Sequence, residues 1–140
     1  IGSGLVGSEM CIRDSWNAIA SAYGSSPFFE YYQDDIRPFF EKRYEFLLDF
    51  NEEIRRTVCN LIGIEPHIEY SSSYSEPAPG ETDLRDVIHP KRRKAETILP
   101  VQLKPYYQVF SEKYGFQPDL SIIDLLMNMG PESILILQNT

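Results

Sequence analysis

Three polar residues, Ser121, Asp124 and Asn128, interrupt an otherwise apolar run near the C-terminal end and are the chain's most pointed candidates for chemistry. Their spacing of three and then four residues places them on one face of a helix. Such a stripe is either the solvated face of that helix or one wall of a pocket. In a pocket the Asp124 carboxylate would be suited to proton transfer, whereas on a solvated face it would only support the start of the helix.

Histidine and cysteine offer fewer candidates. The two histidines, His67 and His89, lie too far apart in the sequence, and have too few potential metal ligands near them, to predict a zinc site. We therefore expect no metal, and we also expect no cofactor. His89 is the better general acid or base, because it ends the run D-L-R-D-V-I-H; a surface or capping role is the alternative for both histidines. Cys59 lies beside an apolar stripe with no local Cys-His pattern, which favours a buried structural thiol over a nucleophile.

Two further stretches suit ligand binding. The basic run from Lys91 to Lys94 is suited to a phosphate or nucleotide anion, although four like charges in a loop are usually just solvated. The aromatic residues from Phe28 to Tyr32 are suited either to stacking on a sugar or base, or to packing in the core. The sequence contains no glycine-rich phosphate loop of either common kind.

The elements that must position these residues are mostly helices. Hydrophobic spacing and Ser121 as a cap predict a helix that Gly130 ends, with Asp124 completing a capping box. Alternation around Ile68 and Tyr70 predicts a short strand. The sequence therefore predicts an α+β fold that is predominantly α-helical, with one or two short strands. Apolar periodicity predicts further helices over residues 16–23, from Asp34 or Asp35 to Leu48, over 51–62 and over 106–114.

Composition excludes several classes of partner. The formal net charge is −8, from 21 acidic and 13 basic residues among 140, which disfavours nucleic acid and anionic membrane as partners. No apolar run is long enough to span a bilayer, so we expect no membrane insertion. Two cysteines indicate no disulfide framework, which fits a reducing compartment.

Residues 1–15 differ from the rest of the chain. They carry no hydrophobic period, and the string L-V-G-S-E-M-C-I-R-D-S looks like a translated sequencing adaptor. We therefore expect residues 1–15 to be a non-native or disordered leader and residues 16–140 to form the domain. A signal peptide is the rival interpretation, but no basic region precedes an apolar one.

Several strings together resemble the WbqC-like protein family. They are S-A-Y-x-S-S-P-F-F-E-Y-Y-x-D-D (21–35), D-L-R-D-V-I-H-P-K (83–91) and Y-x-Q-V-F-x-x-K-x-G-F-x-P-x-L-S-I-I-D-L-L-x-N-x-G-P-E (106–132). The resemblance covers residues 16–137, and it implies that this stretch is the C-terminal portion of a WbqC-like domain whose N-terminal half is absent. Asp119 and Met127 depart from the residues usual at their positions.

The resemblance implies a bacterial, cytoplasmic protein associated with surface-polysaccharide (O-antigen) biosynthesis. On this reading the chain belongs to an enzyme, such as a sugar-modifying transferase, that acts on a nucleotide-activated sugar. Asp124 and His89 are then the catalytic candidates, and five further residues are candidates for binding the substrate: Arg85 and Lys91 for its phosphate, Gln108 and Asn128 for its hydroxyls, and Tyr106.

The alternative is a non-catalytic scaffold or interaction module of the same pathway, in which these residues are caps, core hydrogen bonds and surface charges. Convergence discriminates between the two hypotheses. If Arg85, Gln108, Asp124 and Asn128 line one cavity, the enzyme is favoured, and if they scatter, the scaffold is favoured. Because the partner surface of Trp16, Phe28, Phe29 and the aromatics near Tyr106 would lie in the absent half, self-association through exposed apolar surface is also expected.

Deleting residues 1–15 is expected to leave the melting temperature unchanged, because nothing in that segment is patterned for burial. Thermal unfolding of the shortened and the complete chain, followed by circular dichroism, checks this. A large drop in melting temperature would mean that the segment belongs to the fold.

Overall fold

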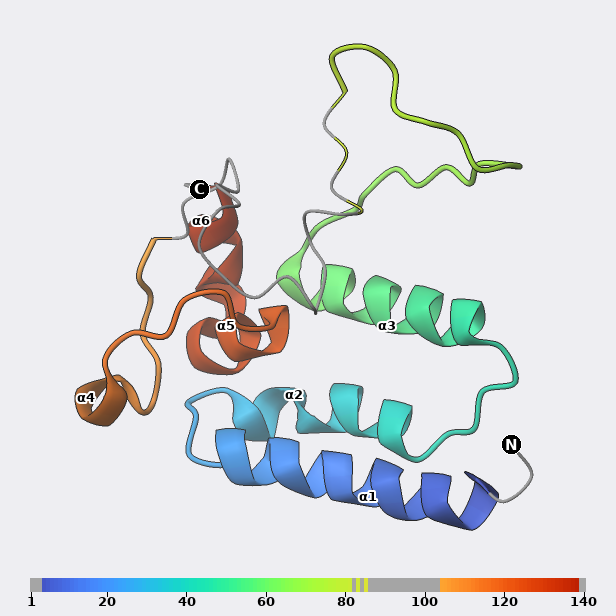
Figure 1. The fold of residues 1–140 in the computed structure, drawn as a ribbon. Helices are drawn as coiled ribbons and strands as arrows, with labels where there is room; N and C mark the ends of the chain where they lie inside the picture. The colour runs from blue at the N-terminus through green and yellow to red at the C-terminus, as the bar shows by residue number, and fades with distance from the viewer. Residues whose placement is uncertain (1–3, 82, 84, 86–103, 139–140) are drawn as a thin grey trace.

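The computed structural model describes residues 4–81, 83, 85 and 104–138, and the side chains among them outside residues 4–12. Three helices, α1 (Gly4–Tyr23), α2 (Phe29–Ile36) and α3 (Leu47–Ile62), lie side by side with α2 in the middle (Figure 1). The short helices α5 (Ile122–Met129) and α6 (Ser133–Gln138) close one end of this layer, and α4 (Ser111–Tyr114) lies outside it. Two 3-10 turns, η1 (Arg37–Phe40) and η2 (Gly130–Glu132), complete the elements.

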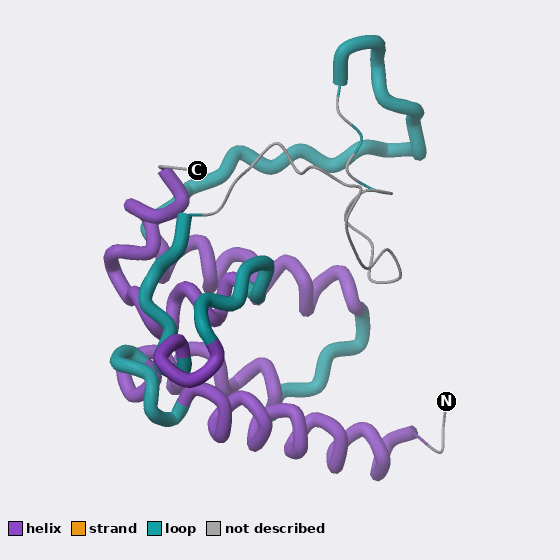
Figure 2. Tube along the Cα trace, turned by 60° about the vertical axis from the view of Figure 1, so that its left-hand side comes forward, coloured by secondary structure: helices purple, strands orange, loops and turns teal. Residues whose placement is uncertain are grey.

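The prediction of an α+β fold is wrong, because the described part of the chain is helical and contains no strand. The alternating residues Ile68 and Tyr70 lie in an extended loop that leaves the helices and are 40% and 65% exposed (Figure 2). A strand exists only when its backbone pairs with a neighbouring strand. Alternation alone predicted the extended conformation but could not supply that partner.

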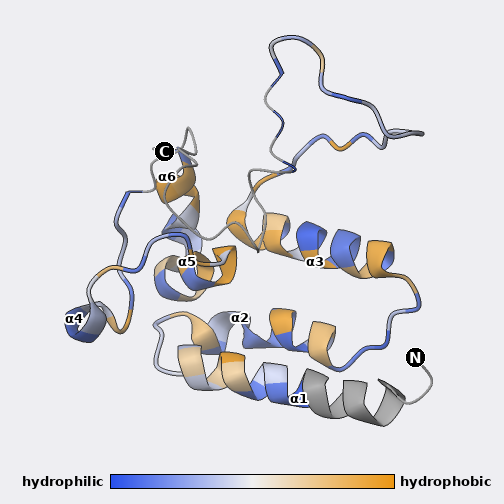
Figure 3. Cartoon of the chain, in the orientation of Figure 1, coloured by the Kyte–Doolittle hydropathy of each residue, from blue (hydrophilic) through white to orange (hydrophobic). Residues whose placement is uncertain are grey.

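The core forms around the aromatic residues of α2. Phe29, Tyr32 and Ile36 are buried and pack against Leu126 and Met127 of α5. In Figure 3 the hydrophobic colouring is concentrated on α5 and on the facing ends of α2 and α3. Each such side chain contributes roughly 1.5–3 kcal/mol when fully buried. Core packing therefore accounts for Phe29 and Tyr32, whereas Tyr31 points outward and is exposed.

The helix predicted from Asp34 or Asp35 to Leu48 is interrupted. Pro38 has no N–H to donate to the carbonyl of Asp34, and the chain tightens there into η1. Residues 41–46 are not helical, and α3 starts at Leu47 rather than at Asn51. As a result Leu47 is 72% exposed.

Two predicted helix ends are confirmed. Gly63 ends α3 with φ of 84°, and its N–H donates to the carbonyls of Cys59 and Asn60. Gly130 ends α5 with φ of 54°, and Pro131 follows in the first turn of η2. At the other end of α5, the Ser121 hydroxyl accepts from the Ile123 N–H at 3.3 Å, as expected of a cap.

The leader predicted over residues 1–15 overlaps α1, which begins at Gly4. The side chains of Arg13, Asp14 and Ser15 are exposed. The origin of this segment stays a prediction. No helix in the described ranges is both long and apolar enough to cross a bilayer.

The surface expected to drive self-association is partly covered. Phe29 is buried, and Trp16 and Phe28 are half-buried against the core, while Tyr107 and Phe110 near Tyr106 are exposed. Self-association itself stays a prediction.

Replacing Gly130 with alanine is expected to destabilise the fold by about 3 kcal/mol. A Cβ at this position would lie 2.5 Å from the Phe28 ring, and positive φ is itself unfavourable for alanine. Gly63→Ala is the matched control, since its φ is also positive but a Cβ there meets nothing within 4 Å. Chemical denaturation should show the larger loss for Gly130→Ala; equal losses would mean that Phe28 moves aside freely.

Candidate functional site

Four of the seven predicted site residues come together around Asp124, on the first turn of α5. The Tyr106 hydroxyl donates to Oδ2 of Asp124 at 2.6 Å, and Nε2 of Gln108 donates to the same oxygen at 3.0 Å. Nδ2 of Asn128 donates to Oδ1 of Asp124 at 3.3 Å. We call these residues, with Tyr23, the Asp124 cluster.

Asp124 and Asn128 of the polar stripe are therefore not solvated, whereas Ser121 is exposed. Asp124 is 5% exposed and Asn128 is 3% exposed. Oδ1 of Asn128 accepts from the Val109 N–H at 3.0 Å, and its Nδ2 also donates to the Asp124 carbonyl at 2.8 Å. The stripe thus binds the segment 106–109 to α5 through both backbone and side-chain contacts.

Gln108 holds residue Gln117 in place in the same way. Its Nε2 donates to the Gln117 carbonyl at 2.9 Å, and its Oε1 accepts from the Gln117 N–H at 2.8 Å. These bonds close the loop that contains α4. The helix predicted over 106–114 is reduced to α4, since the side chains of Tyr106 and Gln108 and the Val109 N–H bond to α5.

The capping box predicted for Asp124 does not form, because the Asp124 carboxylate takes part in the contacts described above. A capping carboxylate reaches back to the amide of its N-cap residue. The Asp124 carboxylate instead receives the hydroxyl of Tyr106 and the amide groups of Gln108 and Asn128. Ser121 alone supplies the side-chain cap of α5.

Sequence reasoning missed Tyr23, the last residue of α1. Burial, followed by the nearby Asp124 charge and the side-chain interaction with Asp124, raises the pKa of Tyr23 from 10.0 to about 12. Burial and the bond to Asp124 also raise the pKa of Tyr106, with Gln108 opposing. Both hydroxyls therefore stay protonated and donate throughout the physiological range. The only signal in the sequence is that Tyr23 lies on the apolar side of its helix with Trp16.

A cavity of about 490 Å³ opens beside the Asp124 cluster. Tyr23, Gln108, Gln117 and Asp124 supply its polar wall. The other lining residues are mainly apolar and come from the end of α1 and from residues 109–120, among them Ala22, Val109, Phe110 and Leu120. A mostly apolar cavity with a few convergent polar groups is typical of small-molecule sites.

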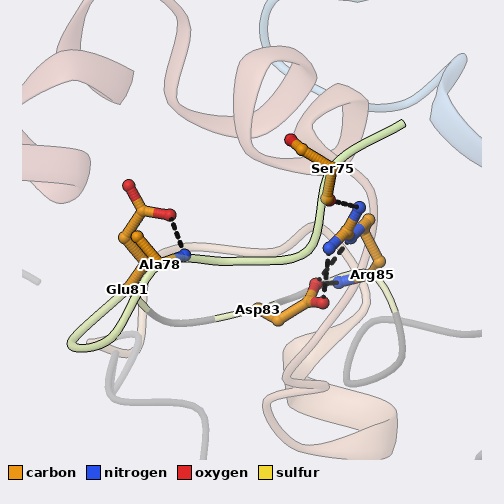
Figure 4. A network of polar contacts seen from close by, with 5 residues as sticks. All are labelled: Ser75, Ala78, Glu81, Asp83 and Arg85. Carbon is orange, nitrogen blue, oxygen red and sulfur yellow. Dashed lines mark hydrogen bonds and ion pairs between the residues drawn. The ribbon is translucent and has the colours of Figure 1, made fainter. Parts of the chain in front are cut away.

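Arg85 lies elsewhere. Its guanidinium donates to Oδ1 and Oδ2 of Asp83 at 2.9 and 2.8 Å and to the Ser75 carbonyl at 3.1 Å (Figure 4). It also stacks over the Tyr74 ring at 4.6 Å, and it lowers the pKa of Asp83 to about 2. Arg85 therefore closes the loop at residues 74–85 and is not part of the Asp124 cavity lining. The other two site predictions, His89 and Lys91, lie outside the described residues.

The remaining candidates are less suited to catalysis. His67 is exposed, with Nε2 3.1 Å from Oε1 of Glu69, and Cys59 is a half-buried free thiol. Within the part of the chain that the structure describes, no group of three or more His, Cys, Asp or Glu side chains is arranged to hold a metal ion.

Alkaline pH is expected to weaken the fold through Tyr23. A folded pKa of about 12 against 10.0 unfolded means that its stabilising contribution is complete below pH 10 and is lost as pH rises towards 12. Melting temperatures of the wild type and Tyr23→Phe should therefore converge in that window. Tyr107→Phe, at an exposed tyrosine, serves as the control. Parallel curves for wild type and Tyr23→Phe would contradict the coupling to Asp124.

The model of the WbqC-like protein family matches residues 5–99, more than half of the chain. The matched residues include Tyr23 but end before Tyr106, Gln108, Asp124 and Asn128. No curated protein and no solved structure matches the chain. The extent of the family match shows that the chain belongs to the WbqC-like protein family.

Proposed function

We propose that the chain is part of a bacterial, cytoplasmic enzyme that acts on a nucleotide-activated sugar in surface-polysaccharide (O-antigen) biosynthesis. Membership of the WbqC-like family supports the pathway by association. The single observation that carries the enzymatic part is the Asp124 cluster on the wall of a 490 Å³ cavity.

The side chains of the cluster suit a sugar. Carboxylate and amide oxygens accept hydrogen bonds from sugar hydroxyls, and tyrosine hydroxyls and amide nitrogens donate to them. Apolar residues such as Val109 and Leu120 would contact the C–H faces of the ring. In this proposal Asp124 accepts the proton of the reacting group, and Gln108 and Tyr23 orient the ring.

The roles of the remaining candidate residues are supported by fewer observations. Asn128 and Tyr106 would hold Asp124 in place, since each donates a hydrogen bond to it and neither lines the cavity. Phosphate binding by Arg85 and Lys91 and catalysis by His89 stay predictions.

A specific observation favours a second candidate, the non-catalytic scaffold. Both oxygens of Asp124 already accept hydrogen bonds from within the chain. A buried carboxylate so paired stabilises the attachment of residues 106–117 to α5 without any chemistry. On this alternative the cavity is a by-product of the packing, and the chain acts as an interaction module of the same pathway.

Asp124→Asn separates the two candidates. In bacteria whose chromosomal gene is replaced by the variant, the enzyme hypothesis predicts near-complete loss of polysaccharide modification, measured by mass spectrometry of the O-antigen. Asp34→Asn, at an exposed aspartate of α2, is the matched control and should behave as wild type. Normal modification by Asp124→Asn would remove Asp124 from catalysis and favour the scaffold.

Stability must be measured beside activity. Asparagine offers one oxygen where Tyr106, Gln108 and Asn128 now share two, so one donor loses its acceptor at a cost of about 1–3 kcal/mol. If this variant does not fold, Tyr23→Phe provides the test, since it keeps the ring that lines the cavity and removes one donor.

A further inference from the structure

The loop that Gln108 and Gln117 close supplies more than half of the residues that line the 490 Å³ cavity beside Asp124. The two bonds between these glutamines, at 2.9 and 2.8 Å, form its neck. Beyond the neck lies the single helical turn α4, none of whose residues is buried. Bonds from Tyr106, Gln108 and Val109 to α5 hold the neck in place, so the loop presents its side chains to the cavity from a fixed base.

Two aromatic side chains of this loop, Phe110 and Tyr114, line the cavity. The Tyr114 N–H donates to the Phe110 carbonyl at 3.1 Å, so one helical turn places both side chains on the same side of the loop. Phe110 is 47% exposed and Tyr114 is 61% exposed. Exposed aromatic surface is informative where it borders a cavity that also contains convergent polar groups.

Both rings retain surface that a ligand can contact. Neither packs against another aromatic ring in the part of the chain that the structure describes. The Nζ of Lys113 lies 5.0 Å from the centroid of the Tyr114 ring, but a ring has two faces, and an exposed contact of this kind is weak. The core aromatics Phe29 and Tyr32, in contrast, are covered by their neighbours.

The polar wall beside these rings keeps unused hydrogen-bond capacity. Oε1 of Gln108 accepts one hydrogen bond, from the Gln117 N–H, and an amide oxygen can accept two. Oε1 of Gln117 accepts none from the described residues, while Nε2 of the same side chain donates to the Tyr114 carbonyl at 2.9 Å. A ligand with hydroxyl groups can therefore donate to this wall without breaking a bond of the Asp124 cluster.

The charge of the cavity also restricts its ligand. Its described lining carries one formal charge, the carboxylate of Asp124, and includes no lysine, arginine or histidine. A phosphate or a second carboxylate in this space would face a like charge with no cation of the lining to offset it. The lining therefore favours an uncharged ligand over an anionic one.

We propose that this cavity binds the uncharged pyranose ring of the substrate, and that Phe110 and Tyr114 determine its specificity. Their rings contact the apolar C–H surface of the pyranose, and the amide oxygens of Gln108 and Gln117 accept from its hydroxyls. A pyranose matches the cavity because it joins an apolar face and a hydroxyl-bearing edge in one rigid ring. The cavity volume lies within the usual range for small-molecule sites, and the phosphates of an activated sugar lie outside it.

This inference rests on the proposed function, since it names the part of the activated sugar that the cavity binds. The two can nevertheless fail separately. If Asp124→Asn binds the sugar and modifies polysaccharide normally, Asp124 loses its catalytic role and the binding site stands. If Asp124→Asn abolishes modification while Phe110→Ala binds the sugar as wild type does, the binding site is wrong and the catalytic role stands.

Titration of the isotope-labelled 140-residue chain with the methyl glycosides of glucose and galactose, followed by NMR, tests the proposal. At least one of the two is expected to shift the amide signals of Gly115 and Gln117 at millimolar concentration. Sorbitol has hydroxyls but no ring, so it is expected to cause no shift. The matching methyl uronide adds only a carboxylate to the sugar, and it is expected to bind at least tenfold more weakly.

Three variants and one control locate the site. Phe110→Ala and Tyr114→Ala are each expected to weaken sugar binding about tenfold, with melting temperatures close to that of the wild type because both residues are exposed. Tyr114→Phe keeps the ring and should bind as wild type. The matched control is Phe46→Ala, at a residue that is 60% exposed and lines a different cavity, at the other end of the described part of α1.

Five results would overturn the proposal. Two concern affinity: no shift with either glycoside at tens of millimolar, or equal affinity in Phe110→Ala and the wild type. A uronide that binds more tightly than its glycoside would show that the cavity is an anion site. Weaker binding in Phe46→Ala would place the sugar in the other cavity, and indole binding more tightly than either glycoside would indicate an apolar ligand.

Discussion

The buried carboxylate of Asp124 is the constraint on which the C-terminal part of the structure depends. A carboxylate removed from water is unfavourable unless hydrogen-bond donors surround it. Here the donors come from residues 106–108 and from α5 itself, through Tyr106, Gln108 and Asn128, and Tyr23 of α1 interacts with the same carboxylate. Satisfying one charge therefore ties together three stretches that lie far apart in the sequence.

Residues of α1 line both cavities. Trp16 and Tyr23 are seven residues apart on α1, so they share a face and are separated by about 10 Å along its axis. Trp16 lines a larger cavity, of about 1020 Å³, and Tyr23 lines the smaller one beside Asp124. The core residues of α2 pack between α1 and α3 and hold this arrangement in place.

The interruption after α2 shows how one residue can redirect the chain. Pro38 stops the regular hydrogen-bond pattern, and the chain leaves the helix axis for residues 41–46. That departure leaves Phe46 and Leu47 exposed and gathers Arg37 and Lys42 on one side. Apolar periodicity predicted a continuous helix to Leu48, because the spacing of the apolar residues was given more weight than the effect of the proline.

By itself the sequence determined the local features, whose causes lie within a few residues. Gly63 and Gly130 end their helices because only glycine adopts positive φ without strain, and Ser121 caps α5 through a neighbouring amide. The polar stripe was visible for the same reason, since helix geometry fixes which residues share a face. Only the tertiary structure decided what that stripe contacts, because Tyr106 is 18 residues from Asp124 in sequence and Tyr23 lies in another helix. It also decided that residues 68–70 pair with no strand in the described part of the chain. In the same way, it decided that Arg85 binds Asp83 away from the cavity, and that residues 106–110 bond to α5 instead of forming a helix. Each of these outcomes depends on a partner distant in the chain, and no local spacing encodes that partner.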